Sequence, residues 1–286
     1  MNNIVWLASY PKSGNTWLRI FLNNLKSPLT EDVSINRLEH IAFSHSARRE
    51  IFDNILPFSS SMLKAEELRL YYNDVYKSYS SDLKEKIFLK NHEAYTYTQG
   101  QEDFPNEVTS SAIYIIRNPL EVACSYANHR GCTLDQSIDF MNDSNYWIAD
   151  EAISYKEQIS QKLLSWSDHV ESWTSDKKFP LLILRYEDMM FKPFETFKQI
   201  VSFLQYTESD TEIKKAIELS EFKVIKKQED DHGFIEKLPG SSSFFRSGQI
   251  DSWKTSLNSE QINRIVDCHG TTMKKYGYLD GSNQAI

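Results

Sequence analysis

Two patterns of different period meet at the stretch Ala8-Ser9-Tyr10-Pro11-Lys12-Ser13-Gly14-Asn15-Thr16-Trp17. The apolar run before it, residues 4–8, has the length of a buried strand. After it, apolar residues recur at helical spacing from Trp17 to Leu25, and Ser27-Pro28 ends the pattern. The sequence therefore predicts a strand, a loop and a helix, with the polar loop residues at the helix start.

The composition of this loop is typical of a phosphate-binding loop. Free N–H groups at a helix start attract anions, and Gly14 lets a phosphate approach the backbone closely. Lys12 adds a positive charge, and Ser13, Asn15 and Thr16 add side-chain donors. Walker A spacing is absent, because the lysine precedes the single glycine. We predict a phosphate loop of another kind; an ordinary turn with a solvated lysine is the alternative.

Length and composition indicate a globular α/β protein. The 286 residues are not divided by any repeat or linker, so we predict a single domain over residues 1–286. A formal charge of −8 without a long basic run argues against a nucleic-acid partner. Three scattered cysteines form neither a disulfide framework nor a zinc site. The short apolar run at the N-terminus favours a cytoplasmic protein with no membrane partner.

The sequence Tyr-Pro-Lys-Ser-Gly-Asn-Thr-Trp resembles the 5′-phosphosulfate loop of sulfotransferases that use 3′-phosphoadenosine 5′-phosphosulfate (PAPS). The chain is most similar to cytosolic sulfotransferases of the bacterial-like, small-molecule type. The resemblance implies that the nucleotide is bound by Lys12, Ser13, Gly14, Asn15, Thr16 and Trp17.

A second strand pattern, Ile87 to Leu89, leads directly into Lys90 and His92. If the extended geometry continues, these two side chains point to the same side, at the carboxyl end where parallel sheets bind ligands. A histidine that caps the strand end is the alternative. The segment resembles the family's Lys-x-His, which implies that His92 is the catalytic base and that Lys90 assists Lys12. The family often continues with Leu-Pro, but this chain has Glu93-Ala94, which leaves the acceptor pocket open.

A third strand pattern, residues 112–116, ends in Arg117. Asn118, Pro119 and Glu121 then form a helix-start signature, with Ser125 near the second turn. A strand that ends in arginine and turns into a helix predicts a second anion site; a surface salt bridge is the alternative. The segment resembles the family's 3′-phosphate-binding segment, which implies that Arg117 and Ser125 hold that phosphate.

Three later segments extend the resemblance to about residue 255. It implies further nucleotide contacts from Tyr186, Ser220, Phe222, Arg246, Ser247 and Gly248. Two residues depart from the family's terminal signature: Ser247 replaces a lysine, and Asp251 replaces a glycine. The missing lysine predicts weaker nucleotide binding.

Four further segments are predicted from periodicity and composition. Residues 65–86, 151–175 and 193–206 show helical spacing, and His169 is expected on the surface of the second of these helices. Residues 226–245 have the composition of a mobile surface segment, which predicts a lid over the acceptor site.

These patterns predict a three-layer α/β sandwich with a central parallel sheet and a P-loop-like phosphate-binding strand–loop–helix. The implied function is transfer of a sulfuryl group from PAPS to a hydroxyl of a small molecule, leaving 3′-phosphoadenosine 5′-phosphate (PAP), with a histidine base and no metal. A P-loop-type kinase and a non-catalytic nucleotide-binding protein are the alternatives. The sequence names neither the acceptor nor the oligomeric state, which is monomer or homodimer.

Overall fold

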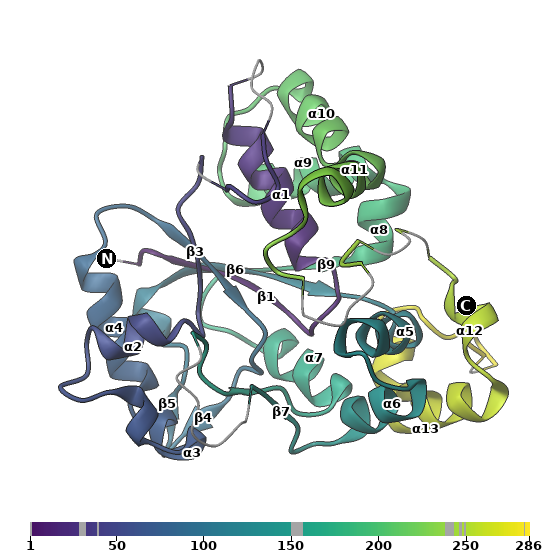
Figure 1. The fold of residues 1–286 in the computed structure, drawn as a ribbon, viewed down its shortest axis with the longest axis horizontal. Helices are drawn as coiled ribbons and strands as arrows, with labels where there is room; N and C mark the ends of the chain where they lie inside the picture. Colours follow the sequence, from purple (N-terminus) through teal and green to yellow (C-terminus); the bar gives the residue numbers. More distant parts are fainter. Residues whose placement is uncertain are drawn as a thin grey trace. The chain divides into compact units, whose positions relative to one another are not determined.

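The computed structural model describes residues 2–28, 33–38, 40–149, 157–237, 243–245, 248, 250–282 and 284–286. Its main sheet has five strands in the order β2-β3-β1-β6-β9 (Figure 1). β3 pairs in parallel with both β1 and β2. The strands are β1 (Ile4–Ser9), β2 (Phe43–His45), β3 (Ile87–Asn91), β6 (Thr109–Ile116) and β9 (Leu181–Arg185).

The middle strand, β1, is buried along its whole length. Its six residues, Ile-Val-Trp-Leu-Ala-Ser, form a nearly continuous apolar run, as expected of a parallel strand covered on both faces. β6 shows the same burial from Ser111 onward. The predicted α/β fold, a central parallel sheet with helices around it, is therefore confirmed.

The chain folds into two compact units, each assembled from three separate segments. The first unit contains Met1–Tyr10, Ala42–Tyr114 and Asp143–Ile183, and the second contains Pro11–Ile41, Ile115–Asn142 and Leu184–Ile286. Because each unit needs segments distant in sequence, neither corresponds to a continuous domain. The single domain over residues 1–286 stays a prediction.

The first unit holds most of the sheet and an aromatic core. Trp6 of β1 makes edge contacts with Tyr76 and Phe104, at 5.1 and 5.0 Å between ring centroids. Its helices are α2 (Arg49–Asp53), η1 (Ser60–Met62), α3 (Ala65–Arg69), α4 (Tyr72–Asp82), η2 (Asn106–Val108) and α7 (Trp166–Thr174). Two small antiparallel ribbons pair β4 (Tyr97–Thr98) with β5 (Gln101–Glu102), and β7 (Trp147–Ile148) with β8 (Gln161–Lys162).

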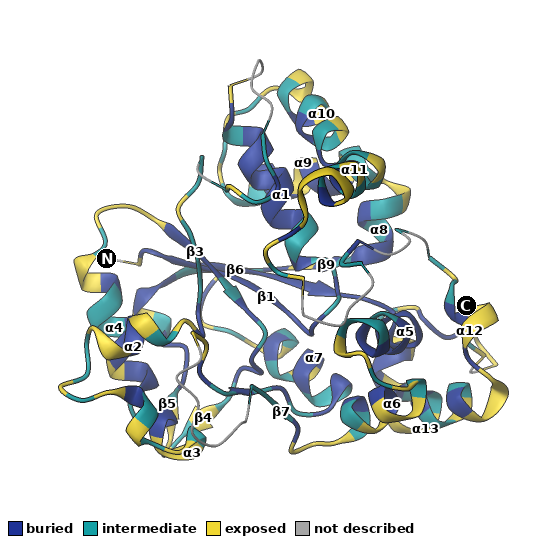
Figure 2. Cartoon of the chain, in the orientation of Figure 1, coloured by how far each residue is buried: buried dark blue, intermediate teal, exposed yellow. Residues whose placement is uncertain are grey.

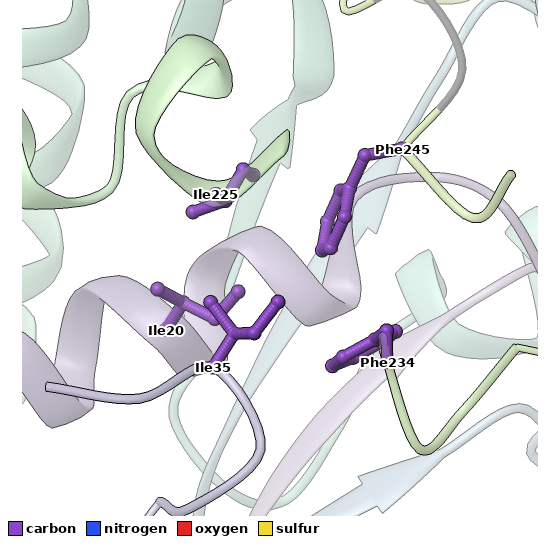
Figure 3. Close-up of a cluster of buried hydrophobic side chains, with 5 residues drawn as sticks. All are labelled: Ile20, Ile35, Ile225, Phe234 and Phe245. Atoms are coloured by element: carbon purple, nitrogen blue, oxygen red, sulfur yellow. The ribbon is translucent and has the colours of Figure 1, made fainter. Parts of the chain in front are cut away.

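The second unit is mainly helical. Its helices are α1 (Asn15–Lys26), α5 (Pro119–Arg130), α6 (Leu134–Asn142), α8 (Tyr186–Phe191), α9 (Pro193–Phe203), α10 (Asp210–Leu219), α11 (Phe222–His232), α12 (Trp253–Ser256) and α13 (Ser259–Lys275). Nine of the twelve residues of α1 are buried, so most of the helix is dark blue in Figure 2. The buried set is mainly apolar but also includes Asn15, Arg19, Asn23 and Asn24. One buried cluster joins α1 to α11 and to the chain beyond it; it consists of Ile20, Ile35, Ile225, Phe234 and Phe245 (Figure 3).

Two predictions from periodicity need correction. The helix over 151–175 is wrong in extent: residues 161–162 form β8, and α7 begins only at Trp166. Leu164 has a left-handed φ of 63°, which interrupts any helix, and the Ser165 hydroxyl then caps α7 by accepting from the Asp168 N–H. Residues 151–156 lie outside the described part of the chain. The helix over 65–86 is divided into α3 and α4.

The surface segment predicted over 226–245 is also wrong in part. α11 continues to His232, and both Phe234 and Phe245 are buried in the apolar cluster. Glu229 of α11 accepts hydrogen bonds from the N–H groups of Phe244 and Phe245, at 2.6 and 3.0 Å. Helix and apolar side chains thus hold this segment in place; residues 238–242 lie outside the description.

Candidate active site

The predicted strand, loop and helix at the N-terminus are confirmed. β1 ends at Ser9 and α1 begins at Asn15, so the phosphate loop comprises residues 10–14. Gly14 has a φ of 107°, and a Cβ at this position would lie 2.7 Å from a ring carbon of Tyr186. Only glycine both adopts this positive φ at little cost and has no Cβ that would collide with the Tyr186 ring. Lys12 also has a positive φ, 68°, so the backbone curls twice within three residues. Successive turns of this kind gather N–H groups around an anion.

Ser13 provides a direct test of whether this loop fits an anionic ligand. Its side chain is 1% exposed, and among the described residues its hydroxyl has no hydrogen-bond partner. An unpaired buried hydroxyl costs about 1–3 kcal/mol of stability. A ligand oxygen would remove that cost, so the loop fits a phosphate or sulfate group.

Arg117 lies beside the phosphate loop within the second unit. It donates to the Lys12 carbonyl oxygen at 3.0 Å and to the Glu121 carboxylate at 3.3 Å, and its guanidinium stacks 4.2 Å from the centroid of the Tyr186 ring. The salt bridge considered as an alternative is present, to Glu121 at 3.3 Å, but it does not lie on the surface, because Arg117 is only 8% exposed. Its Nε is buried and has no partner among the described residues. Arg117 thus has a buried donor that the described residues leave unused.

Two other positively charged side chains near the start of α1, Lys12 and Arg19, contact groups of the same unit. Lys12 Nζ lies 4.0 Å above the Phe244 ring. Arg19, one turn into α1, forms a two-pronged ion pair with Glu236, at 2.7 and 2.9 Å. Thr16 accepts from Arg19 at 3.0 Å and donates to Glu236 at 3.4 Å. The Glu236 carboxylate thus lies against the first turn of α1.

The remaining residues predicted to bind the nucleotide lie at several places in the second unit. Asn15 accepts from Arg19 at 3.2 Å, and Trp17 lies edge-on to Tyr186 with ring centroids 5.9 Å apart. Ser220 is buried at the end of α10 and accepts from Asn24 at 3.0 Å. Ser125 is half-buried in α5.

Phe222 and Gly248 lie against each other. Gly248 has a φ of 55°, and a Cβ there would stand 2.3 Å from the Phe222 ring. Asp251, which replaces a family glycine, keeps a glycine-like φ of 74°. Asp tolerates this conformation better than most residues, so the substitution preserves the backbone path. Arg246 and Ser247 lie outside the described residues.

His92 belongs to the first unit, directly after β3. Its Nδ1 lies 2.8 Å from the Ser9 carbonyl oxygen. A carbonyl can only accept, so Nδ1 carries the hydrogen and Nε2 of the neutral ring keeps a free lone pair. Burial, and then the charge of Lys90, lower the pKa of His92 well below its usual value. The ring is therefore neutral at physiological pH, as a proton acceptor must be.

The departure from the family after His92 has a structural explanation. Glu93 is fully buried, accepts from the Tyr72 hydroxyl at 2.9 Å and pairs with Arg69 at 3.6 Å. Burial raises the pKa of this carboxyl to about 7. Glu93 is thus part of a buried polar network of the first unit.

Sequence reasoning missed the contacts of Glu121 and Glu236 in the second unit, and it misplaced His169 of the first unit. Glu121 was assigned only to the helix start, but it also accepts from Ser252 and from the Trp253 N–H, at 2.9 and 3.0 Å. Glu236 was not considered. His169 was expected on the surface, but it is fully buried. Its spacing from Trp166, Val170 and Trp173 is that of one helix face, which could have revealed this.

A curled loop between the middle strand of a parallel sheet and a helix start is a common place for anion binding in α/β proteins. Residues 2–277 match the model of the sulfotransferase domain family, and the chain belongs to that family. No helix within the described ranges has the length and apolar character to cross a membrane. Nor do the described residues include a group of three or more metal-binding side chains.

Curated relatives are similar over nearly the whole chain. Luciferin sulfotransferase of Photinus pyralis is 24% identical over 270 residues, which cover 90% of this chain and 68% of that protein. Sulfotransferase 1B1 of Mus musculus is 24% identical over 296 residues, covering 94% of this chain and 83% of that protein. Mouse sulfotransferase SULT7A1, solved in complex with PAP, has the same fold, with a TM-score of 0.61 and 18% identity over 96% of this chain and 86% of that one. Retinol dehydratase, solved with androsterone and PAP, also shares the fold, with a TM-score of 0.61, 18% identity, and coverage of 96% and 81%.

Proposed function

We propose that this protein is a PAPS-dependent sulfotransferase, acting as one domain over residues 1–286 on a hydroxyl group of a small molecule. The observation that carries this proposal is the buried hydroxyl of Ser13, which has no hydrogen-bond partner among the described residues and lies in a loop with positive φ at both Lys12 and Gly14. Family membership and the PAP named in two structures of the same fold support it. Relatives named as cytosolic sulfotransferases support action in the cytoplasm.

His92 is the proposed base. Its Nε2 accepts the hydroxyl proton of the acceptor as the acceptor oxygen bonds to sulfur. The hydrogen bond from Nδ1 to the Ser9 carbonyl fixes the ring in the tautomer that leaves Nε2 free. General-base catalysis of this kind contributes about 10²–10⁴-fold in rate.

Lys12 and Lys90 are proposed to stabilise developing charge. Bound PAPS supplies the sulfuryl group, and PAP is the leaving group. The Lys12 ammonium bonds the oxygen that takes up the negative charge, with Lys90 assisting, while Ser13 and the backbone N–H groups at the start of α1 hold the phosphate. This is positioning and electrostatic stabilisation, with no covalent step on the protein.

Arg117 and Ser125 are proposed to bind the 3′-phosphate, together with Arg246 and Ser247. The buried Nε of Arg117 is a suitable donor for this purpose. The other proposed nucleotide contacts come from Asn15, Thr16, Trp17, Tyr186, Ser220, Phe222 and Gly248.

The transfer reaction is tested with radiolabelled PAPS and a panel of phenols, steroid-like alcohols, sugars and natural-product hydroxyls. We expect label to reach at least one acceptor, and we expect His92→Ala to lower kcat by about 10²–10⁴-fold. Calorimetry should give the same PAP affinity for this variant as for the parent. PAP binding without transfer to any acceptor would favour the non-catalytic alternative, and an equal loss of binding and rate would make His92 structural.

A further inference from the structure

One helix of the first unit, α7, holds the backbone that carries the proposed base. His169 Nε2 lies 3.0 Å from the His92 carbonyl oxygen, and Trp173 Nε1 donates to the Glu93 carbonyl at 2.8 Å. The Ser172 hydroxyl accepts from the Tyr95 N–H at 2.9 Å. Three side chains of one helix thus fix three of four consecutive residues after β3.

The hydrogen positions on His169 follow from its two partners. A carbonyl oxygen accepts only, so Nε2 carries the hydrogen and donates to His92. Nδ1, 2.8 Å from the Tyr114 hydroxyl, then accepts from that hydroxyl. The Tyr10 ring lies edge-on, with centroids 5.3 Å apart. Burial lowers the pKa of His169 to about 4, which agrees with a neutral ring that both donates and accepts.

His92 is therefore held at two points. Its carbonyl accepts from His169, and its ring donates to Ser9. With the backbone fixed, the ring cannot turn without losing the bond that selects its tautomer. A base with its lone pair already aimed avoids the cost of ordering during the reaction, and a misplacement of about 1 Å can cost 10²-fold in rate.

We propose that His169 is a positioning residue for His92, and that the Tyr114 hydroxyl selects the His169 tautomer this role needs. This assignment rests on the proposed function, in which His92 is the base. His169 itself touches neither substrate nor nucleotide in this role.

The test compares His169→Leu with His169→Gln. Leucine removes both hydrogen bonds, whereas the glutamine amide can donate to His92 and accept from Tyr114. We expect leucine to lower kcat by about 10–100-fold with PAP affinity unchanged, and glutamine to recover most of that loss. Nitrogen-15 NMR of the His92 ring should show the Nδ1–H tautomer in the parent and in the glutamine variant, and a mixture in the leucine variant.

His269→Leu is the matched control, because His269 is a buried histidine of α13 in the second unit. It should lower the melting temperature without changing the His92 tautomer. A parental kcat and tautomer in a folded His169→Leu protein would overturn the proposal. If that variant does not fold, Tyr114→Phe decides: we expect a few-fold loss of kcat and a mixed His92 tautomer, and no change in either would overturn it.

Failure of this proposal differs from failure of the proposed function. If His92→Ala leaves kcat intact, the base assignment itself is wrong. If His92→Ala abolishes turnover while the His169 and Tyr114 variants behave like the parent, only the positioning role is wrong.

Discussion

The region around His92 and the region around Lys12 are stabilised in opposite ways. The His92 ring donates to the Ser9 carbonyl. Side chains of α7 donate to the backbone carbonyls of His92 and Glu93, so neutral hydrogen bonds hold the base and its backbone. Around the phosphate loop, charged side chains are held by other charges and rings: Arg19 by Glu236, and Lys12 by Phe244. A neutral hydrogen bond fixes the direction of the side chain that makes it. A charged side chain can instead leave its present partner for a more highly charged one.

The difference has a chemical reason under the proposed function. A general base needs its lone pair aimed before the acceptor arrives, so exchangeable partners would be a disadvantage. A site for a polyanionic nucleotide needs concentrated positive charge, which repels itself unless protein groups screen it. The carboxylates of Glu121 and Glu236 supply that screening for Arg117 and Arg19.

The largest expected effect is the loss of kcat/KM when Lys12 is replaced. Lys12→Ala should lower kcat/KM by at least about 10³-fold, because one charge is lost both from nucleotide binding and from the transition state. Lys215→Ala, an exposed lysine of α10, is the control and should behave like the parent. Turnover of Lys12→Ala within a few-fold of the parent would remove the phosphate loop from the mechanism.

The next effect concerns the pH dependence set by the His92 region. Burial and then the positive charge of Lys90 lower the pKa of His92, so Lys90→Met should raise that pKa part of the way toward its ordinary value. The neutral, active ring is lost as pH falls through this pKa. The acidic limb of the plot of kcat against pH should therefore move to higher pH in the variant. This shift does not depend on any change in the maximal kcat. An unmoved limb would show that Lys90 does not face the base.

The smallest effect concerns the carboxylate at the first turn of α1. Glu236→Gln removes a negative charge close to Thr16 and Arg19, where the proposed phosphosulfate binds. Anion binding at a helix start changes by about 0.3–1 kcal/mol per charge, so PAP affinity should rise about 2–5-fold, and less at high salt. Glu218→Gln, an exposed carboxylate of α10, is the control. Weaker PAP binding by Glu236→Gln alone would mean that Glu236 organises the site.

Local sequence patterns were sufficient to predict the strands and helix starts on which the candidate site residues lie. The Asn118-Pro119 start was predicted correctly, and the Asn118 side chain accepts from the Leu120 N–H. Glu236 could not be predicted from its neighbours, because its partner Thr16 lies 220 residues away. The error at His169 had another cause: its neighbours Asp168 and Glu171 are charged, and its helical spacing from Trp166 and Trp173 was overlooked.

The central claim, a site for a 3′-phosphorylated adenosine nucleotide, is tested most directly by calorimetry with PAP and AMP on the parent and on Arg117→Ala. Charge-assisted hydrogen bonds contribute about 1.5–3 kcal/mol each, so the parent should bind PAP at least about 10²-fold more tightly than AMP. Arg117→Ala should weaken PAP binding and leave AMP binding almost unchanged. Equal affinity of the parent for PAP and AMP would contradict the account.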